Sequence, residues 1–104
     1  MAAVVHCKKE KYDVYIGRVS NSKFHYGNPF THKKDTLASV VLGSREECIE
    51  AFRKWVLQED YMHIEPERRN WIRENLHTLK GKTLGCWCKP QSCHGDVLLA
   101  LCER

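Results

Sequence analysis

Three of the chain's six cysteines and one of its histidines fall within nine consecutive residues, where a predicted strand gives way to a predicted helix. Residues 82–87 have the composition of a short strand, and residues 93–102 carry apolar side chains at helical spacing. Binding and active sites of α/β domains favour this position, because the carboxyl end of a strand opens onto a crevice and the next helix begins with free N–H groups. This strand–loop–helix unit indicates an α/β fold with a candidate site inside it.

The remaining elements agree with that class. Two short segments rich in β-branched and aromatic residues, 4–7 and 12–16, predict strands on either side of a charged turn. Capping signals and apolar spacing predict helices over residues 44–60 and 66–80. The order β-β-α-α-β-α predicts a single α/β domain over residues 1–104, a small mixed β-sheet flanked by about three helices.

The chain's length and its apolar runs exclude several classes of protein. A chain of 104 residues has room for one hydrophobic core. The longest apolar runs are far shorter than the ~20 residues of a membrane span, and the first residues lack the apolar stretch of a signal peptide. We therefore expect a cytoplasmic protein without a membrane partner, in which thiols stay reduced and serve packing, metal binding or catalysis.

The positive charge is concentrated in the first part of the chain. The formal net charge is +4, and residues 1–43 hold seven Lys and Arg against three Asp and Glu. Such an excess suits an anionic partner such as a nucleotide or a nucleic acid, although solvated lysines that keep a protein soluble give the same pattern.

The cysteine cluster favours a site for an anion or a nucleophile. Cys93 stands at a helix start, where the helix dipole favours the thiolate, and His94 follows it as a proton carrier. Asp96 is predicted to orient His94, with Cys88 as a resolving or proton-handling partner. The N–H groups around Gly95 would alternatively cradle a phosphate.

Two other interpretations of the cluster remain open. Zinc would take Cys86, Cys88, Cys93 and His94, a Cys₃His set. Sulfurs two residues apart on a strand lie too far apart to share one ion, and the side chains of neighbouring residues at a helix start diverge. In the third interpretation the cysteines pack as small apolar residues, which is also what we expect of Cys7, Cys48 and Cys102.

Two further segments offer ligand contacts. Arg18 follows a predicted strand and could clamp a phosphate or carboxylate with its planar guanidinium. In the turn 27–30, Asn28 could present its amide to a ligand, and Phe30 could stack on a base. We expect Arg18 and Asn28 to face the start of the Cys93 helix across one pocket.

Three blocks, residues 12–18, 27–30 and 85–96, together resemble one protein family, the domain of unknown function 4326. The resemblance covers nearly the whole chain and implies a small single-domain protein of a kind found in bacteria and their phages, with members in some viruses and eukaryotes. It also implies which positions carry the motif: Arg18, Asn28, Cys86, Cys88, Cys93, His94 and Asp96. Tyr26 stands where some members have tryptophan, so an aromatic contact rather than a particular ring is implied.

These observations favour one pocket for a phosphorylated ligand, and two functions use it differently. The first is a thiolate-dependent enzyme that processes nucleotides or nucleic acid, with Cys93 as nucleophile or acid, His94 as proton carrier and Arg18 as phosphate clamp. The alternative is a module without catalysis, stabilised by zinc, that binds nucleic acid or a host factor.

Overall fold

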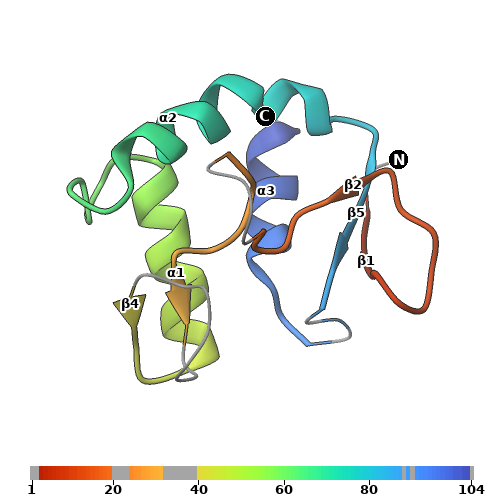
Figure 1. Cartoon of the computed structure of the whole chain (residues 1–104), viewed down its shortest axis with the longest axis horizontal. Coiled ribbons are helices and arrows are strands. Elements are labelled where there is room, and N and C mark those ends of the chain that lie inside the picture. Colours follow the sequence, from red (N-terminus) through yellow and green to blue (C-terminus); the bar gives the residue numbers. More distant parts are fainter. Residues whose placement is uncertain (1–2, 20–23, 32–39, 88, 90, 104) are drawn as a thin grey trace.

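Strand β5 (Thr83–Cys86) is the centre of the main sheet, between β1 (Ala3–His6) and β2 (Val14–Tyr15) (Figure 1). Both neighbours run parallel to β5. The computed structural model describes residues 3–19, 24–31, 40–87, 89 and 91–103, so the predicted site residue Cys88 lies outside the described residues. The last strand of the chain thus separates the first two, and the sheet ties both halves of the sequence together.

A second, two-stranded sheet pairs β3 (Phe30–Thr31) with β4 (Val40–Val41), again in parallel. The expected mixed sheet is therefore two small sheets, and every strand pair among the described residues is parallel. Both extra strands lie in a region that showed no periodic pattern, because two residues are too few to produce one.

The helices follow the predicted order and confirm the α/β class. They are α1 (Arg45–Val56), α2 (Pro66–Asn75), which continues into the 3₁₀ helix η1 (Leu76–Leu79), and α3 (His94–Cys102). The predicted cap of α1 is present, because the side chain of Ser44 accepts a hydrogen bond from the Glu47 N–H. No helix within the described ranges is long and apolar enough to cross a membrane.

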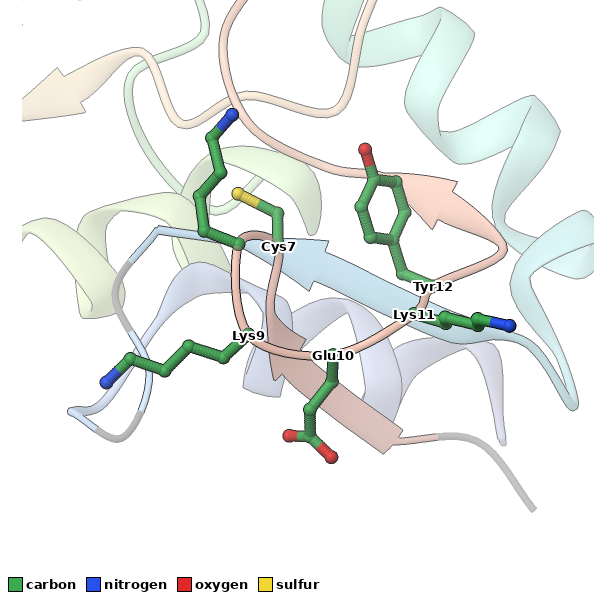
Figure 2. Close-up of a pocket in the computed structure, with 6 residues that line it drawn as sticks. Cys7, Lys9, Glu10, Lys11 and Tyr12 are labelled. Carbon is green, nitrogen blue, oxygen red and sulfur yellow. The ribbon is translucent and has the colours of Figure 1, made fainter.

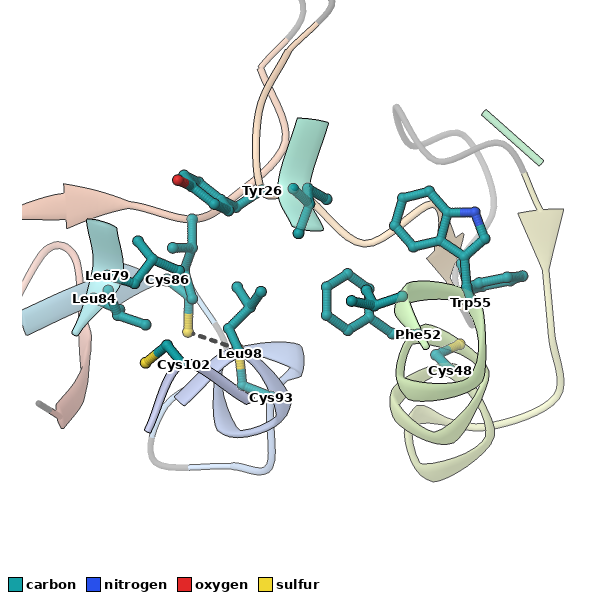
Figure 3. Packing of buried hydrophobic residues seen from close by; sticks show 14 of the residues in the cluster. Tyr26, Cys48, Phe52, Trp55, Leu79, Leu84, Cys86, Cys93, Leu98 and Cys102 are labelled. Atoms are coloured by element: carbon teal, nitrogen blue, oxygen red, sulfur yellow. Dashed lines mark hydrogen bonds between the residues drawn. The ribbon is translucent and has the colours of Figure 1, made fainter. Parts of the chain in front are cut away.

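The core lies between the sheet and the helices, with α3 between α1 and the main sheet (Figures 1 and 3). Phe52 and Trp55 of α1, Leu84 of β5 and Leu98 of α3 are all fully buried. Burying each such side chain contributes roughly 1.5–3 kcal/mol to stability. Cys48 and Cys102 belong to this core, as expected of them, whereas Cys7 is half-buried.

The chain between β1 and β2 crosses the outer face of β5. The Cys7 N–H bonds the Cys86 carbonyl at one end of β5, and the Asp13 N–H bonds the Thr83 carbonyl at the other. The Tyr12 ring thereby lies over Gly85, where an added Cβ would come within 2.6 Å of a ring carbon. The crossing needs glycine at this position because backbone and ring are in direct contact.

Candidate functional site

Cys86 and Cys93 meet at the carboxyl end of β5, and both are almost completely buried. Cys86 is the last residue of the strand and Cys93 is the N-cap of α3. Their sulfur atoms lie 2.9 Å apart (Figure 3). The end of β5 and the start of α3 thus bring together two thiols that are seven residues apart in sequence.

The start of α3 is closed by its own residues. The Cys93 sulfur accepts the Gly95 N–H at 3.4 Å, and the Asp96 carboxylate accepts the Cys93 N–H at 3.1 Å, which together make a capping box. The other oxygen of Asp96 pairs with Lys89 at 2.8 Å, which raises the pKa of the Lys89 ammonium. Asp96 therefore binds the Cys93 N–H and the Lys89 ammonium, whereas the sequence predicted that it would orient His94.

His94 takes its orientation from the backbone directly after β2. Its Nε2 lies 2.7 Å from the Ile16 carbonyl oxygen, and its Nδ1 lies 3.5 Å from the Cys93 sulfur. The edge of the ring packs on Phe52 in the core. The first motif block, residues 12–18, therefore meets the third, residues 85–96, as predicted, but the contact is made by a backbone carbonyl.

Asn28 and Phe30 are structural in this arrangement. The Asn28 amide donates to the Cys48 carbonyl at 3.1 Å and accepts from the Phe30 N–H at 2.9 Å. Phe30 is buried and packs edge-on against Tyr61. Arg18, which is half-buried, lies against Gly27 of the same turn. The three blocks converge in space, yet the amide and the ring predicted to meet a ligand face the protein interior.

Arg68 is a buried anchor that the sequence did not identify. Its guanidinium donates to the carbonyls of His25 and Gly27, pairs with Glu65 at 2.8 Å, and lies 5.2 Å from the centre of the Trp55 ring. In the sequence it stands among the charged residues 65–69 at the start of a predicted helix, a pattern typical of a solvated surface. Its i−3 neighbour Glu65 is the kind of partner that exposed helix arginines have, so no local signal predicts its burial.

The Arg68 charge and burial act on His25. The pKa of His25 is lowered to about 4, mainly because the ring is buried and secondly because of the nearby Arg68 charge. The neutral ring accepts the Gly27 N–H through Nδ1 at 3.1 Å. The turn before Asn28 therefore depends on an uncharged imidazole.

Exposed aromatic and basic side chains gather beside the carboxyl end of β5. Trp87 is 55% exposed and its indole N–H donates to the Tyr15 hydroxyl at 2.8 Å. The Lys8 ammonium lies 5.5 Å from the centre of the Trp87 ring, and His6 packs on the ring edge-on. Burial raises the pKa of Tyr15, so its hydroxyl stays protonated. We call this group the Trp87 surface: His6, Lys8, Tyr12, Tyr15 and Trp87.

The loop that crosses β5, residues 7–12, is called the crossing loop. It borders an open hollow next to this surface. Residues 7–12 line a cavity of about 530 Å³. Figure 2 shows Cys7 and Tyr12 projecting to one side of the loop, while Lys9, Glu10 and Lys11 point outward. Three of the six lining residues are lysines, so the hollow adds positive charge beside exposed rings.

The predicted zinc ligands are only partly described. Among the described residues, no group of three or more His, Cys, Asp or Glu side chains could hold a metal ion. Cys88, the remaining member of the predicted set, falls outside them.

Comparison with known proteins matches residues 5–104 to a family described as domain of unknown function (DUF4326). Uncharacterized protein R718 of Acanthamoeba polyphaga mimivirus is 35% identical over 103 residues, which cover 86% of this chain and 65% of that protein. An uncharacterized 12.4 kDa protein from the nrdA-td intergenic region of Enterobacteria phage T4 is 37% identical over 62 residues, 60% of this chain and 52% of that protein. The chain thus spans between half and two thirds of these relatives, and no solved structure matches.

Proposed function

This chain belongs to the DUF4326 family, and from that premise we propose that it binds a phosphorylated ligand, a nucleotide or a single-stranded nucleic acid, at the Trp87 surface. The observation that carries the proposal is the exposure of Trp87 directly after the central strand, with the Lys8 ammonium beside its ring. The carboxyl ends of parallel strands are the usual place for such ligands in α/β domains.

The chemistry of this surface suits bases and phosphates together. A base stacked on an exposed aromatic ring gains about 1–3 kcal/mol, and lysine ammonium groups neutralise phosphates. Trp87 and Tyr12 offer the rings, with exposed fractions of 55% and 42%. Lys8, Lys9 and Lys11 are all exposed and supply the charge.

The proposal locates binding differently from the pocket expected from sequence. Asn28 and Phe30 are buried and engaged with the protein, so neither belongs to the proposed surface. Cys93, at 1% exposure, faces the core rather than the ligand. Catalysis by Cys93, His94, Asp96 and Cys88 stays a prediction, as does a cytoplasmic location.

The test is fluorescence anisotropy with a labelled oligothymidylate, competed by mononucleotides. We expect Trp87→Ala to weaken binding by about five- to a hundredfold, because a stacked base is worth about 1–3 kcal/mol. Phe24→Ala is the matched control, since Phe24 is 44% exposed but stacks on Trp71 away from β5. The proposal fails when the wild type binds neither probe, or when both variants weaken binding equally. Competition by mononucleotides separates a nucleotide site from a strand-binding surface.

A zinc-stabilised module is the alternative, and metal analysis tests whether zinc stabilises this domain. Protein purified without chelator would contain near-stoichiometric zinc, and Cys86→Ser would lose both the metal and the fold. Binding through the Trp87 surface is compatible with either result, so this measurement concerns how the domain is held together.

A further inference from the structure

The Cys86 and Cys93 thiols are placed for a reaction with each other. Their sulfurs are 2.9 Å apart, about 0.9 Å more than the ~2.05 Å of a disulfide bond. Each sulfur is held by a rigid element, Cys86 by the central strand and Cys93 by the capping box of α3. Little movement of either element is needed to join them.

His94 supplies the base that such a reaction needs. A carbonyl oxygen only accepts hydrogen bonds, so the 2.7 Å contact with the Ile16 carbonyl assigns the proton of the neutral ring to Nε2. Nδ1 is then the acceptor, and it lies 3.5 Å from the Cys93 sulfur. Nucleophile, base and orienting group thus stand in the order found in sites with activated thiols.

We infer that Cys86 and Cys93 are a site of reversible intramolecular disulfide formation, with Cys93 as the attacking thiol, His94 as its base and Cys86 as the resolving thiol. The oxidant is hydrogen peroxide, whose small size suits a pair that is 99% buried. The inference does not depend on ligand binding at the Trp87 surface.

The chemistry balances in two steps. Nδ1 of His94 takes the Cys93 proton, the thiolate attacks one peroxide oxygen, and the O–O bond breaks. The departing hydroxide takes the proton back from the imidazolium and leaves as water, with a sulfenic acid at Cys93. The Cys86 sulfur then attacks the Cys93 sulfur, and hydroxide leaves with the Cys86 proton as a second water. Two thiols and one peroxide give one disulfide and two waters.

The experiment follows intact mass and thiol alkylation of the folded protein during peroxide treatment. We expect a loss of two mass units, a Cys86–Cys93 peptide in the digest, and recovery of both thiols with a reductant. Cys93→Ser should abolish the mass change, and serine at position 93 still caps α3. Cys86→Ser should stop at the sulfenic acid, so it should gain the mass of one oxygen and form no disulfide. Cys48→Ser is the control, because Cys48 is also buried but lies on α1.

The role of His94 is tested separately by His94→Gln. Glutamine can still donate to the Ile16 carbonyl but has no basic nitrogen, so disulfide formation should slow at least tenfold while circular dichroism stays that of the wild type. An unchanged rate would remove His94 from the proposal.

Two results would overturn the inference. In the first, peroxide adds oxygen to the half-buried Cys7 and leaves Cys86 and Cys93 reduced. In the second, both thiols resist alkylation and peroxide until a chelator removes a bound metal, which would make them ligands.

Discussion

At the scale of single residues, some polar side chains that the sequence favoured as ligand contacts instead hold parts of the fold together. Asn28 was recognisable as a turn residue, but its partner is a carbonyl twenty residues away on α1, which no local pattern reveals. Arg68 is similar, because the two carbonyls to which it donates lie more than forty residues away. Long-range hydrogen bonds leave no periodic signal, so residue types alone did not separate anchors from ligand contacts.

Asn28→Ala should destabilise the domain by about 2–4 kcal/mol, since it leaves the Cys48 carbonyl and the Phe30 N–H buried without their partner. Urea unfolding measures the loss. Asn28→Asp keeps an acceptor for Phe30 but places a carboxylate oxygen against the Cys48 carbonyl, so it should be no better than alanine. Asn70→Ala, at an exposed position on α2, is the control and should change stability by less than about 0.5 kcal/mol. Equal effects at both positions would contradict the anchoring role.

His25 gives the fold a specific sensitivity to acid. Its folded-state pKa of about 4 lies below the unfolded value of 6.5, so protons bind the unfolded chain first as the pH falls. Stability is complete above pH 6.5, decreases between pH 6.5 and 4, and loses nothing more from this group below pH 4. Because the ring is only half-buried, solvent screening limits the loss to about 1–2 kcal/mol.

His25→Asn should remove this part of the pH dependence, because an amide oxygen can accept the Gly27 N–H without titrating. Unfolding in urea at pH 7 and pH 4.5 provides the comparison. The exposed His63 serves as control, and His63→Asn should retain the full wild-type difference. A His25→Asn protein that loses as much stability as the wild type would refute the assignment.

At the scale of elements, local signals predicted the helices but not the strand order. The Ser44 cap and Pro66 at the first position of α2 are short-range features, and the structure contains both. The insertion of β5 between β1 and β2 depends on pairing between residues some 70–80 positions apart. The cysteine block was correctly placed at a strand end and helix start, since that boundary is local.

The crossing loop and β5 are coupled through one contact, between Tyr12 and Gly85. Gly85→Ala would bring a methyl group within 2.6 Å of the Tyr12 ring and should cost about 1–3 kcal/mol. Removing the ring as well, in Gly85→Ala with Tyr12→Ala, should recover part of that loss, so a double-mutant cycle in urea should show a coupling of at least about 0.5 kcal/mol.

Gly43→Ala is the matched control for this cycle. The atoms nearest to its added Cβ would belong to the Glu47 carboxylate, the first at 3.2 Å, and that flexible group can move away. We expect a change below about 0.5 kcal/mol. Strict additivity of the Tyr12 and Gly85 substitutions would show that the loop does not rest on the strand.

At the scale of the whole molecule, charge and fold act together. Residues 44–80 hold seven basic and eight acidic side chains, so the excess positive charge comes from the N-terminal part. The parallel sheet then places the crossing loop of that part on the outer face of β5, beside Trp87. Within this loop Lys8, Lys9 and Lys11 outnumber Glu10, so part of the excess positive charge lies near exposed rings.

This arrangement predicts the salt dependence of binding at the Trp87 surface. Each lysine that neutralises a phosphate of a single strand contributes about −0.7 to the slope of log K against log salt. With Lys8, Lys9 and Lys11 engaged, the slope for an oligothymidylate should be near −2, and each Lys→Gln change should reduce its size by about 0.7. Lys80→Gln, at an exposed site after η1, should leave the slope unchanged. A slope near zero, or one that Lys80→Gln alters as much as Lys8→Gln does, would mean that the anion binds elsewhere on the molecule.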